Sequence, residues 1–315
     1  MLKRALMFGL LVAAAIGLQA QDAGGHRPAA KPPAQSGLWS RLTEDLTKLA
    51  DEVDGRVGVY LRSLDTGETF SLRGDEVFPA ASTIKLALLL ELYRQSEGPA
   101  GAARLSDEYV LQPRDLVEGS GILGNLGPGT RLTLRDLALF TVAVSDNAAT
   151  NILIDRVGME RVNATLAGLG LQKTRLRRQM MDFQAARAGR ENHATPRELA
   201  ELLSVIHHGS LLSQTARADL LRLLKTPKDG FLTRLLPEEL AVANKPGTLP
   251  GVRNDAGLVF VKGRPFVLAV MTSHLRDERQ GEAAIARIAL RAAAWFEVAG
   301  AASPEGRLFG PLLVR

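Results

Sequence analysis

The chain has 315 residues, of which 46% are apolar and 23% charged, an ordinary composition for a globular protein with one large domain. Its net charge of +5 is mild, aromatic residues are few and no basic run occurs, so nucleic-acid binding is disfavoured. The absence of cysteine excludes disulfides, cysteine nucleophiles, thiolate metal sites and lipid attachment at an N-terminal cysteine.

The first twenty residues have the pattern of a secretory signal peptide. A basic start at Lys3-Arg4 precedes an uncharged apolar run from Ala5 to Leu18, and small residues follow it. The run is shorter than the roughly 20 residues that a membrane-spanning helix needs. We therefore expect cleavage after Ala20, a periplasmic or secreted product and no membrane anchor in the mature protein.

Three further segments follow the signal peptide. Residues 21–38 are rich in alanine, proline, glycine and glutamine and predict a flexible leader. We expect a main domain over 39–300 and a C-terminal tail over 301–315. At the start of the domain, apolar spacing predicts a helix, two strands of an antiparallel hairpin and a second helix, over residues 39–53, 56–64, 69–72 and 82–95.

The middle of the chain is predicted to be helical. Residues 97–130 are rich in glycine and proline, with short helical pieces at best, and residues 171–194 lack apolar periodicity, which predicts a long loop. Thr195-Pro196 followed by Glu198 is a strong helix start. The predicted helices of this part cover residues 134–144, 148–156, 159–168, 196–207 and 213–224.

Strands return in the last third of the chain. They are predicted over residues 240–247, 254–262 and 265–272, and an amphipathic helix over 282–298 closes the domain. Strands at both ends with helices between them predict an α+β fold with one antiparallel sheet built from the N- and C-terminal segments. Terminal helices would cover one face of the sheet, and an inserted all-helical part over residues 81–224 would cover the other face. The part that contains the sheet would comprise residues 39–80 and 225–300.

Ser82 and Lys85 form the first motif with chemical potential. They lie three apart at the start of an apolar helix, so both are expected on one face, where they can share a hydrogen bond. A helix N-terminus favours developing negative charge on Ser82. Burial among leucines and alanines should lower the pKa of Lys85 and let it accept a proton near neutral pH. Ser-x-x-Lys also arises by chance, so partners are needed.

Two later motifs supply those partners. Ser145-Asp146-Asn147 interrupts two predicted helices; all three residues are good caps for the second helix, but Ser145 and Asn147 can instead face a cleft while Asp146 holds the loop. Lys245-Pro246-Gly247-Thr248 ends a predicted strand, where a lysine alone would usually be a solvated residue.

With the three motifs in this order, the chain resembles the class A β-lactamase family over about residues 40–298. The resemblance implies that Ser82 is the nucleophile, that Lys85 accepts its proton directly or through water, and that Ser145 passes a proton to the lactam nitrogen. It further implies that substrate is bound by side chains from three segments, namely Asn147, Lys245, Thr248 and Arg253. The backbone N–H groups of Ser82 and Thr248 would form the oxyanion hole.

Two features depart from the family pattern. Pro246 stands where the family usually has a residue with a hydroxyl group. Because proline lacks a backbone N–H, we expect it on an edge strand. Thr248 or Arg253 would replace the substrate contact that the hydroxyl makes. The loop over 171–194 lacks the Glu-x-x-x-Asn pattern that carries the deacylating glutamate. Asp182 is our candidate for the water-activating group, with a loop-closing ion pair to Arg177 or Arg178 as the alternative, and Glu191 is expected to stabilise the loop base.

Other hydrolase classes fit less well. There is no Gly-x-Ser-x-Gly motif for a Ser-His-Asp hydrolase and no His-x-His or His-Glu-x-x-His for a metal site, so we expect no cofactor and no metal. Three functions remain open. We favour a β-lactamase acting as a monomer on a small β-lactam; the alternatives are a D-Ala-D-Ala peptidase or esterase that reacts slowly with penicillins, and a non-catalytic β-lactam receptor.

Overall fold

The structure, a computed structural model, describes residues 33–99, 102–117, 121–303 and 306–314. The expected signal peptide and most of the expected leader lie outside these residues. Within them, no helix has the length and apolar character that crossing a membrane requires.

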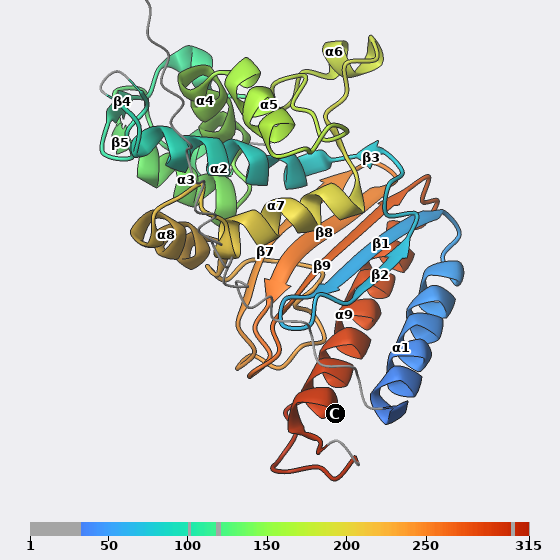
Figure 1. Cartoon of the computed structure of the whole chain (residues 1–315). Coiled ribbons are helices and arrows are strands. Elements are labelled where there is room, and N and C mark those ends of the chain that lie inside the picture. Colours follow the sequence, from blue (N-terminus) through green and yellow to red (C-terminus); the bar gives the residue numbers. More distant parts are fainter. Residues whose placement is uncertain (1–32, 100–101, 118–120, 304–305, 315) are drawn as a thin grey trace, which may run out of the picture. The chain divides into compact units, whose positions relative to one another are not determined.

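A five-stranded antiparallel sheet forms the centre of the fold, as the sequence predicts (Figure 1). Its strands follow one another in the order β2-β1-β9-β8-β7, so N- and C-terminal segments share one sheet and β7 is an edge strand. The strand bounds are β1 (Arg56–Ser63), β2 (Thr69–Leu72), β7 (Val242–Leu249), β8 (Val252–Val259) and β9 (Phe266–Ser273).

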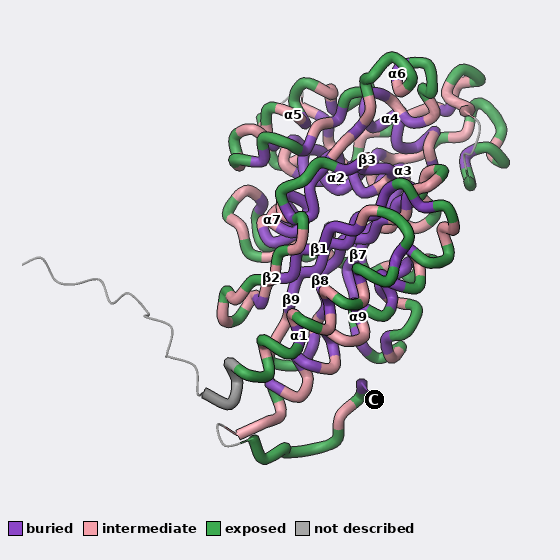
Figure 2. The backbone as a smooth tube through the Cα atoms, turned by 90° about the vertical axis from the view of Figure 1, so that its right-hand side faces the viewer, coloured by how far each residue is buried: buried purple, intermediate pink, exposed green. Residues whose placement is uncertain are grey.

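Helices cover both faces of this sheet. The terminal helices α1 (Pro33–Asp51) and α9 (Glu278–Ala301) pack on each other and on one face, and α7 (Pro196–His208) packs on the other (Figure 1). Each face has its own apolar core, and Figure 2 shows buried backbone both in the sheet and in the helical part around α2 (Lys85–Ser96). Both terminal helices begin earlier than predicted; α9 does so because Asp277 caps it through the Arg279 N–H, ahead of the apolar pattern.

The inserted part is helical, as predicted. Its elements are η1 (Ala81–Ile84), α2 (Lys85–Ser96), η2 (Pro113–Asp115), η3 (Leu123–Asn125), α3 (Leu134–Ala143), α4 (Asn147–Val157), α5 (Met159–Gly168), α6 (Phe183–Arg187) and α8 (Gln214–Leu224). Two short strand pairs were not predicted, because two or three residues carry no periodicity. They are β3 (Phe78–Pro79) with β6 (His193–Ala194), and β4 (Glu108–Val110) with β5 (Arg131–Thr133).

Candidate active site

Ser82 lies in η1, the short 3₁₀ turn that leads into α2, and it is half-buried. The residue before it, Ala81, has a φ of 49°, a left-handed conformation that costs a residue with a side chain on the order of 1 kcal/mol. The approach to this turn is tied to the sheet, because the Asn254 amide of β8 donates to the carbonyls of Pro79 (2.8 Å) and Ala80 (3.2 Å). The strained turn is thus fixed from outside, and it presents Ser82 at a defined place.

Ser145 connects Ser82 to two lysines. Its hydroxyl donates to Ser82 Oγ at 2.9 Å, and Lys245 Nζ donates to Ser145 Oγ at 3.0 Å. Lys85 Nζ donates to the Ser145 carbonyl (2.7 Å), to Ser145 Oγ (3.1 Å) and to Asn147 Oδ1 (3.1 Å). The expected direct contact between Ser82 and Lys85 is therefore replaced by one through Ser145, because carbonyl oxygens of the 145–147 loop attract the lysine head group.

In the Ser145-Asp146-Asn147 loop, Asp146 stabilises the backbone and the two flanking side chains lie near Ser82, as predicted. Ser145 has a φ of 54° and Asp146 is fully buried. The Asp146 carboxylate accepts from the Ala149 N–H, which caps α4, and from the Leu123 N–H, both at 2.9 Å. This leaves Ser145 and Asn147 on the side of the loop that faces Ser82.

Both lysines are completely buried, and burial controls their charge. Burial lowers the pKa of Lys85 well below its ordinary value, and the neighbouring charge of Lys245 lowers it further. Burial also lowers the pKa of Lys245, to about 7, against the attraction of Asp255. The lowered pKa favours the neutral, proton-accepting form of Lys85, while Lys245, with a pKa of about 7, remains partly charged at neutral pH.

Strand β7 brings Lys245 and Thr248 to Ser82. Position 247 must be glycine, because a Cβ there would lie 2.8 Å from the backbone N of Ser82 and 3.0 Å from that of Thr83. Close passage of this edge strand places the Thr248 backbone next to the Ser82 turn. The requirement of Pro246 for an edge strand is met, since β7 is the last strand of the sheet.

Two hollows meet at Ser82, Ser145 and Thr248. The first, which we call the methionine hollow, has a volume of 220 Å³ and is also lined by Met180 and Met181. The second, the arginine hollow, has a volume of 270 Å³ and is lined by residues of β7, β8, α9 and the loop before β7, namely Asp229, Phe231, Arg234, Lys245, Pro246, Gly247, Arg253 and Glu282.

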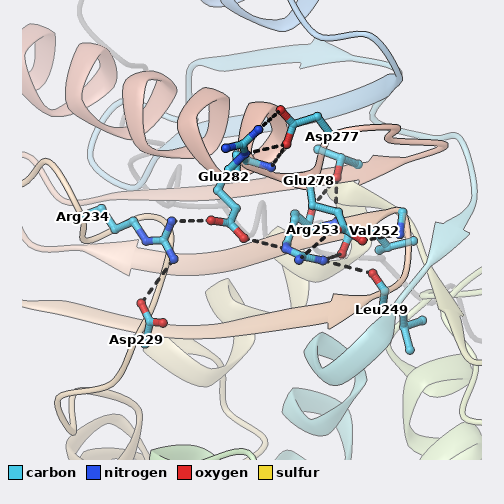
Figure 3. A network of polar contacts seen from close by, with 11 residues as sticks. Asp229, Arg234, Leu249, Val252, Arg253, Asp277, Glu278 and Glu282 are labelled. Atoms are coloured by element: carbon cyan, nitrogen blue, oxygen red, sulfur yellow. Dashed lines mark hydrogen bonds and ion pairs between the residues drawn. The ribbon is translucent and has the colours of Figure 1, made fainter.

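In the arginine hollow, Arg253 is held by protein groups on several sides (Figure 3). Its Nε donates to Glu282 at 2.8 Å, and its Nη1 donates to the carbonyls of Leu249 (3.1 Å) and Val252 (2.9 Å). Glu282 also accepts from Arg234 Nη1 at 2.7 Å. The Arg234 side chain is 37% exposed against 16% for Arg253, so Arg234 is the more accessible guanidinium. Neither Arg234 nor Glu282 was predicted from the sequence, because neither lies in a motif.

In the methionine hollow, the loop over 171–194 turns in a way that the sequence did not predict. Met180 is 7% exposed, and Asn151 fixes its backbone by accepting from its N–H (2.7 Å) and donating to its carbonyl (3.1 Å). Met181 has a φ of 67°, and the chain then turns outward. Asp182 is exposed and caps α6 through the Ala185 N–H.

The expectation that the methionine pair aims the Asp182 carboxylate at the site is therefore corrected: the methionines line the methionine hollow with Ser82, and Asp182 does not line either hollow. The alternative ion pair of Asp182 is formed with neither Arg177 nor Arg178 within the described residues, and Arg178 instead pairs with Glu191 at 2.7 Å. That contact agrees with the expected role of Glu191 at the loop base.

Comparison with known proteins identifies the family. A family model described as "Beta-lactamase enzyme family" matches residues 41–296. This chain belongs to that family. Curated relatives of class A include the β-lactamase SME-1 of Serratia marcescens, 29% identical over 79% of this chain and 88% of its own length. The carbapenem-hydrolyzing β-lactamase KPC of Klebsiella oxytoca is 30% identical over 80% of this chain and 88% of its own length.

Solved structures agree with the sequence relatives. A β-lactamase from Sphaerobacter thermophilus superposes with a TM-score of 0.74 at 35% identity, covering 82% of this chain and 97% of that one. A mutant of PBP-A, solved as an acyl-enzyme complex with penicillin G, has the same TM-score at 28% identity and covers 82% of this chain and 97% of its own. The class A β-lactamase fold predicted from the motifs is thereby confirmed.

Proposed function

We propose that this chain is a secreted serine hydrolase that opens the β-lactam ring by acylation of Ser82. The observation that carries the proposal is the hydrogen-bonded connection from Ser82 through Ser145 to two buried lysines. The basic and apolar start of the chain supports secretion. The curated relatives named as β-lactamases support the substrate class.

Acylation would begin with neutral Lys85 as the proton acceptor. Neutral Lys85 has two N–H groups, which can remain on the Ser145 carbonyl and Asn147 Oδ1, so its lone pair faces Ser145 Oγ. The Ser145 hydroxyl turns from Ser82 to Lys85, gives its proton to Nζ and accepts the Ser82 proton, while Ser82 Oγ attacks the lactam carbonyl carbon. The carbonyl oxygen becomes an oxyanion, which the N–H groups of Ser82 and Thr248 would stabilise by about 3 kcal/mol per donor. Collapse breaks the carbonyl–nitrogen bond, and the nitrogen receives a proton from the Ser145 hydroxyl, which takes one in turn from a lysine.

Substrate binding would use both sides of the cleft. Asn147 holds the side-chain amide of the substrate, and the partly charged Lys245 attracts its carboxylate. Thr248 and Arg253 are the contacts expected from the sequence. The donors of Arg253 are largely engaged with Glu282 and two carbonyls, so we propose that Arg234 makes the guanidinium contact and that Arg253 positions Glu282.

Deacylation is where the geometry favours a second candidate function. Met180 and Met181 of this loop line the methionine hollow together with Ser82, and none of the described residues that line it carries a carboxylate. Without a general base, water attack on a β-lactam acyl-enzyme should be slow. A D-Ala-D-Ala peptidase or esterase is supported by this observation, because its leaving group departs and opens the cleft to an acceptor, whereas the leaving nitrogen of a β-lactam stays attached to the acyl group after ring opening.

Reaction of the purified protein with a chromogenic cephalosporin separates these functions. Intact mass is recorded at intervals while hydrolysis is followed by absorbance. Steady turnover with little adduct supports a β-lactamase. A single burst with a lasting adduct supports the peptidase or esterase, which would then be tested on D-Ala-D-Ala peptides and esters. The absence of both an adduct and turnover would refute acylation of Ser82 by β-lactams.

A further inference from the structure

A large cavity lies away from Ser82. It has a volume of 610 Å³, within the usual range of small-molecule sites, and is lined by residues of the loop after α8 and of the start of β7. We call it the lysine cavity, because Lys225 and Lys228 line it together with an apolar wall that includes Leu236, Leu240 and Val242. It shares no lining residue with the methionine or arginine hollows.

We propose that the lysine cavity binds a small organic carboxylate whose apolar body packs against the leucine and valine wall and whose charged end meets Lys228. This site is distinct from the proposed acylation site and does not depend on the proposed function.

Lys228 is suited to hold an anion. It is half-buried, and its hydrogen bond within the described chain goes to the Leu224 carbonyl at 2.7 Å. An ammonium group has three donors, so two remain for a ligand. The second ammonium, of Lys225, lies 4.0 Å from the ring centroid of Phe260. Glu238, which is exposed, carries the one carboxylate among the described lining residues, so the cavity has an excess of positive charge.

The buried charged residues next to the cavity also favour an anionic ligand. Asp255 is fully buried and interacts electrostatically with both Lys228 and Lys245. Its carboxylate accepts hydrogen bonds from the Leu232 N–H and the Asn244 amide rather than from either lysine. One buried carboxylate therefore serves two lysines, and buried charge is unfavourable unless it is compensated. A ligand carboxylate beside Lys228 supplies the missing negative charge on the side away from Ser82.

Phenylacetate is a suitable probe, and its neutral analogue phenylacetamide is the matched control for charge. Isothermal titration calorimetry of the whole purified protein should detect binding of phenylacetate, and phenylacetamide should bind at least tenfold more weakly. Lys228→Met, which keeps chain length and removes the ammonium, should weaken phenylacetate binding at least tenfold. Glu238→Gln should strengthen it, and Lys48→Met, a substitution of an exposed lysine on α1, should not change it.

Proton uptake gives a second readout. Burial lowers the pKa of Lys228 to about 8, so part of the population is neutral at pH 8 and must gain a proton when a carboxylate binds. Calorimetry in buffers of different ionisation enthalpy should show uptake of a fraction of a proton at pH 8, and Lys228→Met should remove this uptake. The other charged groups around Lys228 are Lys225, Glu238, Asp255 and Lys245.

Two results would overturn the proposal. Unchanged phenylacetate affinity in a correctly folded Lys228→Met variant would exclude Lys228 as the anchor. Loss of binding in Arg234→Ala would place the carboxylate in the arginine hollow instead. Circular dichroism and thermal unfolding of each variant establish that the comparison is made on folded protein.

Discussion

Substitution of Met180 by glutamate should shorten the lifetime of the Ser82 acyl-enzyme. Met180 is 7% exposed, lines the hollow beside Ser82 and is fixed through its backbone by Asn151. Glutamate has a side chain of similar length, so its carboxylate should lie where the thioether lies now. That position belongs to the methionine hollow, which Ser82 also lines and whose described lining residues include no general base for the attacking water.

The size of the effect follows from two opposing terms. A positioned general base contributes a factor of roughly 10² to 10⁴. Burial raises the pKa of an introduced carboxylate and reduces its ionised fraction near pH 7, which favours the lower end of that range. We therefore expect deacylation to become roughly 10²-fold faster, equivalent to about 2.7 kcal/mol in activation free energy.

The assay is the decay of the adduct mass after excess penicillin is removed. Met180→Gln is the matched control, because it has the size and polarity of the glutamate without its charge. If the glutamate and glutamine variants both fold, both acylate and lose the acyl group at the same rate, the introduced carboxylate does not act as a base.

Four further predictions concern the same site. Lys85→Ala should slow acylation by roughly 10² to 10⁴, measured as the rate of adduct formation, and near-normal labelling would remove Lys85 as the base. The pKa of Lys245 is about 7, so its charge is present below that pH and lost above it; KM for a carboxylate-bearing β-lactam should rise as pH increases through 7, and a flat profile would contradict this. Asp182→Asn should leave deacylation unchanged, because asparagine also caps a helix and the carboxylate lies outside the hollow; a large loss would restore Asp182 as the base. Arg234→Ala should raise KM for carboxylate substrates roughly tenfold with little change in kcat, whereas Arg253→Ala should mainly lower Tm; the reverse pattern would return the substrate contact to Arg253.

The fold was predictable because its elements carry strong periodicity or strong end signals. The strands β1, β8 and β9 and the helix start at Thr195-Pro196 were located within a few residues. The edge position of β7 followed from Pro246 alone, since an internal strand would lose a hydrogen bond there. The elements that were missed, β3 to β6 among them, are too short to show a period, and tertiary contacts define them.

The site was predictable only where residues belong to motifs. Ser82, Lys85, Ser145 and Lys245 do come together, but the connection through Ser145 depends on a positive φ that no spacing reveals. The loop around Met180 shows more clearly what the sequence could not predict. Its apolar pair was expected to turn inward and does, yet a left-handed residue then sends the next side chain outward.

The most direct test of Ser82 as the nucleophile is the mass of the protein after reaction with penicillin. Proteolytic mapping should find the adduct on the peptide that contains Ser82, with an increase equal to the whole penicillin, because ring opening loses no atoms. Ser82→Ala should remove the adduct completely while the protein stays folded. An adduct that persists in Ser82→Ala, or that maps to another peptide, would contradict the assignment of Ser82 as the nucleophile.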